Sequence, residues 1–189
     1  MEVLFTAAVY DKGAVKTYVI ASNAEEKDKD TVAMFISAIY QILPTDPELE
    51  EDVIWSDGCG GELKNQFMAV FLRGMVGKYK RNFHWKFFAT SHGKGVVDGV
   101  GGVVKRVVRQ AVVSRQAVVN DARTFAKVAK SGVKTTTLIY VDESEILRPN
   151  PLWTQARKIK KLRSAPSDRL CPDRLCPGVL MLFCRLIFN

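Results

Sequence analysis

Apolar residues run together in short stretches in some parts of the chain, and in others they recur every three to four residues. The first pattern is typical of β-strands and the second of helices that bury one face. Turn-forming residues between the stretches separate the elements. Together they predict the order β-β-α-β-α-β-α-α-β. The strands are expected at 3–10, 14–21, 53–56, 83–90 and 135–141, and the helices at 32–43, 62–76, around 98–109, and at 115–130.

A strand hairpin, with Asp11-Lys12-Gly13 as its tight turn, opens this order. Alternating strands and helices then predict an α/β protein, a mixed sheet with helices on both faces. This is the element order of a ribonuclease-H-like fold, except that such folds begin with three antiparallel strands. Only two strands precede the first helix here, so the sequence predicts that the first strand is lacking.

The chain changes character after Pro149. Residues 1–147 are expected to form the core and residues 148–189 a basic, irregular tail. The tail contains an exact tandem copy, 168–172 followed by 173–177, which is more typical of a recent gene accident than of a packed element. We expect the part from about residue 164 to lie outside the fold. No signal peptide is evident, and the apolar tail is too short to cross a bilayer, so neither secretion nor a membrane partner is expected.

Charge is distributed unevenly along the 189 residues, whose formal net charge is +8. Between Lys94 and Lys134 there are nine lysines and arginines and only two acids. Such a one-sided pattern is typical of a surface that follows phosphates, although a merely basic protein is the plain alternative. The four cysteines form no C-x-x-C pair, which argues against a zinc finger. We expect nucleic acid as the partner, with DNA favoured over RNA.

Two acids stand at the ends of predicted elements. Asp57 follows the apolar strand 53–56, and Asp98 lies in the first turn of a helix. Clustered carboxylates can hold cations that activate water and stabilise a leaving oxygen in phosphoryl transfer, and Mg²⁺ prefers oxygen ligands. We therefore expect Asp57 and Asp98 to be catalytic and metal-binding residues for Mg²⁺ or Mn²⁺. Taken singly, Asp57 also suits a turn before glycine, and Asp98 suits the positive end of a helix dipole.

A glycine-rich loop before Asp98 contributes His92 and Lys94, which could contact phosphate. Its spacing is not that of a P-loop. Asp98, Lys105 and Arg109 then fall near one face of the helix, with Arg106 beside them. We expect His92, Lys94, Lys105, Arg106 and Arg109 to bind nucleic acid. The alternatives are a histidine hydrogen-bonded within its loop and a solvated helix face.

Three segments carry a resemblance. Ile54 to Gly58, Lys64-Asn65-Gln66-Phe67, and Phe87 to Arg106 resemble a family of transposon-derived proteins present as many animal genomic copies. Its motifs are S-D-G…F-K-N-x-F and F-F-A-T-S-H-G-K-G-x-x-D-G-x-G-G-x-x-K-R. The resemblance covers about residues 3–146 and implies a DDE-type transposase or integrase core. By that analogy Asp57 is the second acid and Asp98 the third.

The first acid of such a core should lie on the first strand, which is lacking, and Asp11 in a hairpin turn substitutes poorly. We therefore expect a fragment of a transposase-like core, with metal-dependent phosphoryl transfer by ancestry and no remaining activity. The alternatives are a domesticated nuclear module that binds nucleic acid or protein without catalysis, and a gene relic without function. A nuclear location is favoured over a cytoplasmic one, and homo-oligomerisation is left open.

Overall fold

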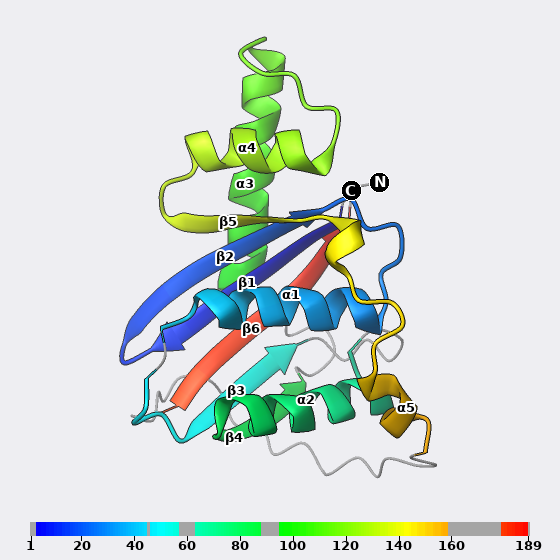
Figure 1. The fold of residues 1–189 in the computed structure, drawn as a ribbon. Helices are drawn as coiled ribbons and strands as arrows, with labels where there is room; N and C mark the ends of the chain where they lie inside the picture. The colour runs from blue at the N-terminus through cyan, green and yellow to red at the C-terminus, as the bar shows by residue number, and fades with distance from the viewer. Residues whose placement is uncertain (1–2, 45, 57–62, 88–94, 159–178, 189) are drawn as a thin grey trace.

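The computed structural model describes residues 3–44, 46–56, 63–87, 95–158 and 179–188. Its strands form a six-stranded sheet in the order β4-β3-β6-β1-β2-β5 (Figure 1). The strands are β1 (Val3–Asp11), β2 (Ala14–Ser22), β3 (Glu51–Ser56), β4 (Asn82–Phe87), β5 (Thr136–Val141) and β6 (Val179–Phe188). The helices are α1 (Lys29–Ile42), α2 (Gln66–Tyr79), α3 (Val96–Val113), α4 (Ala122–Gly132), α5 (Leu152–Ala156) and the 3-10 turn η1 (Glu143–Glu145).

Two smaller groups of strands make up the sheet. In one group β1 pairs antiparallel with β2, and β2 pairs parallel with β5. In the other group β3 pairs parallel with β4. The strand β6 joins the groups, because it lies antiparallel to β1 and parallel to β3. The protein therefore has a mixed α/β fold, as the sequence predicts.

The strand β6 corrects one expectation. We expected the part of the chain from about residue 164 to lie outside the fold. This is wrong for Val179–Phe188, which forms a central strand between β1 and β3. Two strands precede α1, as predicted. A run of apolar residues suits a strand covered on both faces. Local patterns did not reveal it because both of its pairing partners are far away in the sequence.

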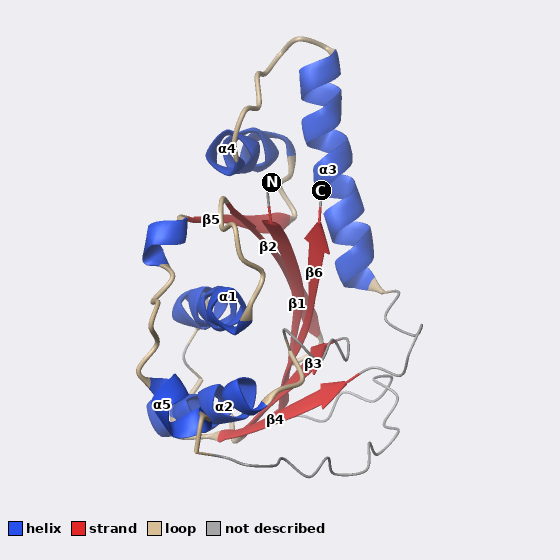
Figure 2. Ribbon diagram, turned by 90° about the vertical axis from the view of Figure 1, so that its right-hand side faces the viewer, coloured by secondary structure: helices blue, strands red, loops and turns tan. Residues whose placement is uncertain are grey.

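Helices cover both faces of the sheet, as predicted (Figure 2). On one face, α1 and α2 pack against alternate residues of β1, including Phe5 and Val9, in a cluster that also contains Ile54 of β3. On the other face, α3 and α4 pack against Leu4 of β1 and Val19 of β2. Because successive side chains of a strand point to opposite faces, β1 contributes to both clusters.

The expected boundary at residue 148 does not mark the end of packing. Trp153 of α5 is 4% exposed and its indole Nε1 donates a hydrogen bond to Asp30 of α1. Its ring also meets Phe67 of α2 edge-on, with ring centroids 5.6 Å apart. Arg148 forms an ion pair with Glu26 at 2.7 Å. The packed unit therefore includes α5.

Capping residues set the helix bounds. The side chain of Asp28 accepts hydrogen bonds from two backbone N–H groups at the start of α1, and Asn65 does the same for α2. We expected Ser114 to begin a helix at Arg115. Instead Ser114 ends α3, because its hydroxyl donates to backbone carbonyls of that helix. Asp121 caps α4 through a capping box with Thr124, so α4 begins at Ala122.

Candidate nucleic-acid interface

The parallel strands β3 and β4 end side by side, with Ser56 paired to Phe87. Ser56 is fully buried, and its hydroxyl accepts a hydrogen bond of 2.9 Å from the indole Nε1 of Trp85. This bond fastens the carboxyl end of β3 to β4. The predicted acid Asp57 comes next in the chain. It lies outside the described residues, as do His92 and Lys94.

Asp98 lies in the first turn of α3, where its backbone N–H donates to the carbonyl of Gly95 at 3.1 Å. Its side chain is half-buried. The helix contacts β1, β2 and β6, and its C-terminal end projects past β5 in both views (Figures 1 and 2). A carboxylate in the first turn of a helix is favoured by the helix dipole. This placement is compatible with both of the roles expected for Asp98.

Three basic side chains follow Asp98 along α3 and form what we call the α3 basic face: Lys105, Arg106 and Arg109. Successive residues of a helix are rotated by about 100°, and the buried row of α3 ends with Val104 and Val108. Lys105 and Arg109 each stand one residue after that row. Lys105 is half-buried, whereas Arg106 and Arg109 are exposed. The predicted helix face thus borders the core and opens to solvent at its arginines.

A second basic row, on α4, was not selected as a site from the sequence. This α4 basic row consists of Arg123, Lys127 and Lys130, which are all exposed. Their spacing of four and three residues places them on one side of the helix, and this spacing was the signal that could have identified them. The α3 basic face and the α4 basic row belong to helices that share one core cluster. They are therefore on the same side of the sheet.

The first residue of the α4 basic row is held in a small polar cluster. The guanidinium of Arg123 lies 4.8 Å from the ring centre of Tyr140 and 3.6 Å from a carboxylate oxygen of Asp142. Hydrogen bonds from Ser144, followed by one from Tyr140, lower the pKa of Asp142 to about 2. Asp142 is therefore ionised at neutral pH and offsets the charge of Arg123. Lys127 and Lys130 form no ion pair with the residues that the structure describes.

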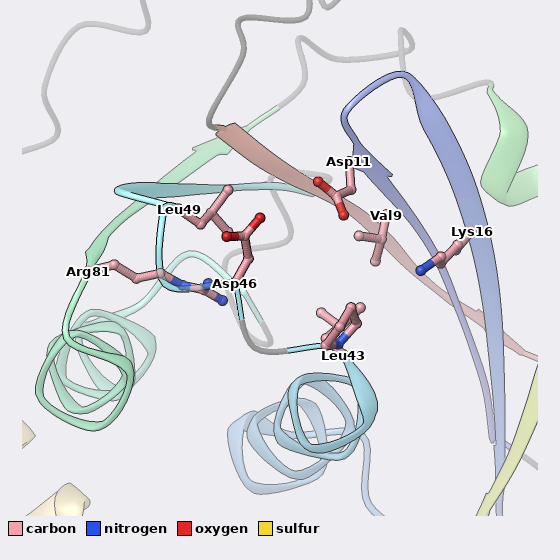
Figure 3. Close-up of a pocket in the computed structure, with 8 residues that line it drawn as sticks. Val9, Asp11, Lys16, Leu43, Asp46, Leu49 and Arg81 are labelled. Atoms are coloured by element: carbon pink, nitrogen blue, oxygen red, sulfur yellow. The ribbon is translucent and has the colours of Figure 1, made fainter.

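A pocket at the hairpin end of β1 shows where the remaining acid candidate lies (Figure 3). Asp11 and Asp46 both line this pocket, together with Arg81, and Asp46 forms an ion pair with Lys12 at 2.8 Å. In the strand register, the Asp11 end of β1 lies level with the start of β3, whereas Ser56 stands at the opposite end. Asp11 is therefore remote from the position that follows Ser56 and cannot complete an acid cluster there.

Behind the pocket lies a buried polar cluster that sequence patterns did not indicate. Asp52 is fully buried, and one of its carboxylate oxygens lies 2.7 Å from Nε of Arg81. Burial raises the pKa of Asp52 to about 6, although the nearby Arg81 charge opposes this shift. Burial also raises the pKa of Tyr40 well above its usual value. We interpret this cluster as structural, because it joins α1 to the starts of β3 and β4.

Comparison with known proteins gives one match. A family described as "Domain of unknown function (DUF8701)" matches residues 2–165, and the chain belongs to that family. No curated protein and no solved structure matches the chain. In the part of the chain that the structure describes, no helix is long and apolar enough to span a membrane. The transposon resemblance goes further than this match and therefore enters the proposal below.

Proposed function

We propose that this protein binds nucleic acid through the α3 basic face and the α4 basic row, and that it does not catalyse phosphoryl transfer. The observation that carries this proposal is the exposure of Arg106 and Arg109 on a helix that projects from the sheet. Among the described residues, neither arginine forms an ion pair, so both charges are available to phosphates. Arginine is well suited to binding phosphate because its planar guanidinium group can donate two parallel hydrogen bonds to phosphate oxygens.

The strand arrangement supports descent from a ribonuclease-H-like, transposase-type core. Such folds begin with three antiparallel strands, and the sequence supplies only two before α1. In the structure, β6 pairs antiparallel with β1 and parallel with β3. That is the position which the missing first strand would take. The proposed ancestral fold is therefore complete in outline, with its first strand supplied from the other end of the sequence.

The same strand argues against catalysis. The first acid of a DDE-type core is expected on the first strand, but the sequence of β6, VLMLFCRLIF, has neither Asp nor Glu. Asp11 lies at the wrong end of β1. Within the described residues, no group of three or more metal-ligating side chains occurs. The acids that the structure describes therefore do not make up a two-metal phosphoryl-transfer site, and we derive no step through Mg²⁺ or Mn²⁺.

Binding is tested by fluorescence anisotropy with a labelled DNA duplex over a series of salt concentrations. The double variant Arg106→Gln/Arg109→Gln should bind at least about tenfold more weakly, and its salt slope should fall by about two, one for each lost phosphate contact. The matched control is Arg73→Gln/Lys78→Gln. It removes two exposed charges from α2, on the opposite face of the sheet, and should bind like the wild type.

Three results would decide against parts of the proposal. If wild type does not bind DNA or RNA at low salt, nucleic-acid binding is wrong and a protein-interaction module becomes the better interpretation. If both double variants lose affinity equally, the binding is a response to net charge rather than to the α3 basic face. If RNA binds more tightly than DNA under the same conditions, the expectation of a DNA partner is wrong.

A further inference from the structure

The centre of the sheet contains a gap that one separable strand fills. Within the described chain, β1 and β3 do not pair with each other, and β6 lies between them. Eight residues of β1, Val3–Tyr10, face Phe188–Met181 of β6. Six residues of β3, Glu51–Ser56, face Val179–Cys184. Without β6, two edges rich in apolar residues would be left with unpaired backbone N–H and carbonyl groups.

The two strands that border this gap, β1 and β3, are the walls of the gap, and both pack against other elements. Phe5 and Val9 of β1 belong to the same buried cluster as Ile54 of β3, and this cluster also contains Phe35 and Ile39 of α1. All five side chains are at most 1% exposed. The shared cluster therefore connects β1 and β3 across the gap, and the arrangement of β1 relative to β3 does not depend on β6 alone.

The filling strand stands apart from the core in the sequence. The family match ends at residue 165, and residues 159–178 separate β6 from the last residues described before it. The matched region thus contains both walls of the gap but not the strand between them. The β6 sequence is apolar throughout except for Arg185, which suits a central position in a sheet.

We propose that the gap between β1 and β3 is a strand-binding site and that β6 is its tethered ligand. The site takes an extended, apolar segment that runs antiparallel to β1 and parallel to β3. Main-chain hydrogen bonds on both sides provide the affinity, as in proteins that bind peptides by adding a strand to a sheet. A segment with the β6 sequence therefore binds the same site when it is supplied as a separate peptide.

The test uses the full-length variant Leu182→Pro and a peptide of residues 178–189 with added C-terminal lysines for solubility. Leu182 lies opposite Val9 and Ile54 in the register, and proline there removes a central N–H group and prevents regular pairing. We expect the variant to melt at a lower temperature than wild type. The peptide should restore the melting temperature in a saturable manner, whereas a peptide carrying the same proline should not.

If the variant does not fold alone, it is refolded with and without the peptide and compared by circular dichroism, and recovery only with the unmodified peptide supports the proposal. The proposal is overturned if Leu182→Pro melts like the wild type, if neither peptide has an effect, or if both peptides act equally. The register is tested separately in a full chain whose Cys59, Cys171 and Cys176 are changed to serine.

In that background, Ala7→Cys should form an intramolecular disulfide with Cys184, which lies directly opposite in the register. The matched control is Ala8→Cys, because the next residue of a strand points to the other face of the sheet. Cross-linking of the control, or none with Ala7→Cys, would show that β6 does not occupy the gap in this register.

Discussion

Burial of Asp52 should make the protein less stable as the pH rises from about 4 to about 6. The carboxyl group is fully buried, and its pKa is about 6 in the folded chain against an ordinary value of 3.8. Between these two values, the folded state binds a proton that the unfolded state has released. The free energy of unfolding therefore falls as the pH rises through this range, and the loss is complete above the folded pKa.

The size of this effect follows from the shift in pKa. A difference of roughly 2 units corresponds to about 3 kcal/mol, because each unit is worth about 1.4 kcal/mol. The shift is the balance of opposing effects. Burial disfavours the charged carboxylate and raises the pKa, whereas Arg81, 2.7 Å away, favours the charged form and lowers it. Asp52→Asn removes the titrating group while preserving its shape. Its unfolding free energy should not show this fall between pH 4 and pH 6.

The assay is urea denaturation of both proteins at half-unit steps from pH 4 to pH 7, with the slope m compared at each pH. Asp46→Asn is a useful control, because the hydrogen bond from Lys12 lowers the pKa of Asp46 below its ordinary value of 3.8. The stability that this carboxylate contributes is lost only as the pH falls below that value, so Asp46→Asn should keep the fall of the wild type between pH 4 and pH 6. Equal pH slopes for wild type and Asp52→Asn would refute the reasoning, because they would mean that Arg81 keeps Asp52 ionised throughout.

Three further predictions concern α3, α4 and the acids. A methyl group at Gly132 would collide with Val107 of α3, so Gly132→Ala should lower the unfolding free energy by about 1–3 kcal/mol. Adding Val107→Ala should recover most of this loss, and no recovery would contradict the contact. Asp121→Ala should cost about 1 kcal/mol, because α4 loses its capping box, and an unchanged urea midpoint would argue against the cap. Finally, if Asp57 and Asp98 still share a cation, Mg²⁺ or Mn²⁺ should raise the melting temperature of wild type but not of Asp57→Ala/Asp98→Ala, whereas no shift in either protein would remove the metal site.

The local pattern of residues was sufficient to predict the turns and helices that depend on residues close together in the sequence. The turn at Lys12 and Gly13 is an example, because both residues have positive φ angles, of 45° and 81°, as the tight turns of hairpins require. The spacing of residues around 98–109 likewise predicted a helix there, and α3 spans Val96–Val113. The boundary between α3 and α4 was predicted less well. Ser114 and Asp121 can both cap a helix, and only the bonds that they form decide between them.

The sequence by itself determined the class of fold, the two helix-covered faces of the sheet and the concentration of positive charge on α3. The tertiary structure alone decided that Val179–Phe188 is a central strand, that Asp11 lies level with the start of β3 whereas Ser56 ends that strand, and that Asp52 is buried beside Arg81. The physical reason is the same in each case. Strand pairing and the burial of a charge depend on groups that are distant in the sequence, whereas periodicity reports only on groups one or two turns apart.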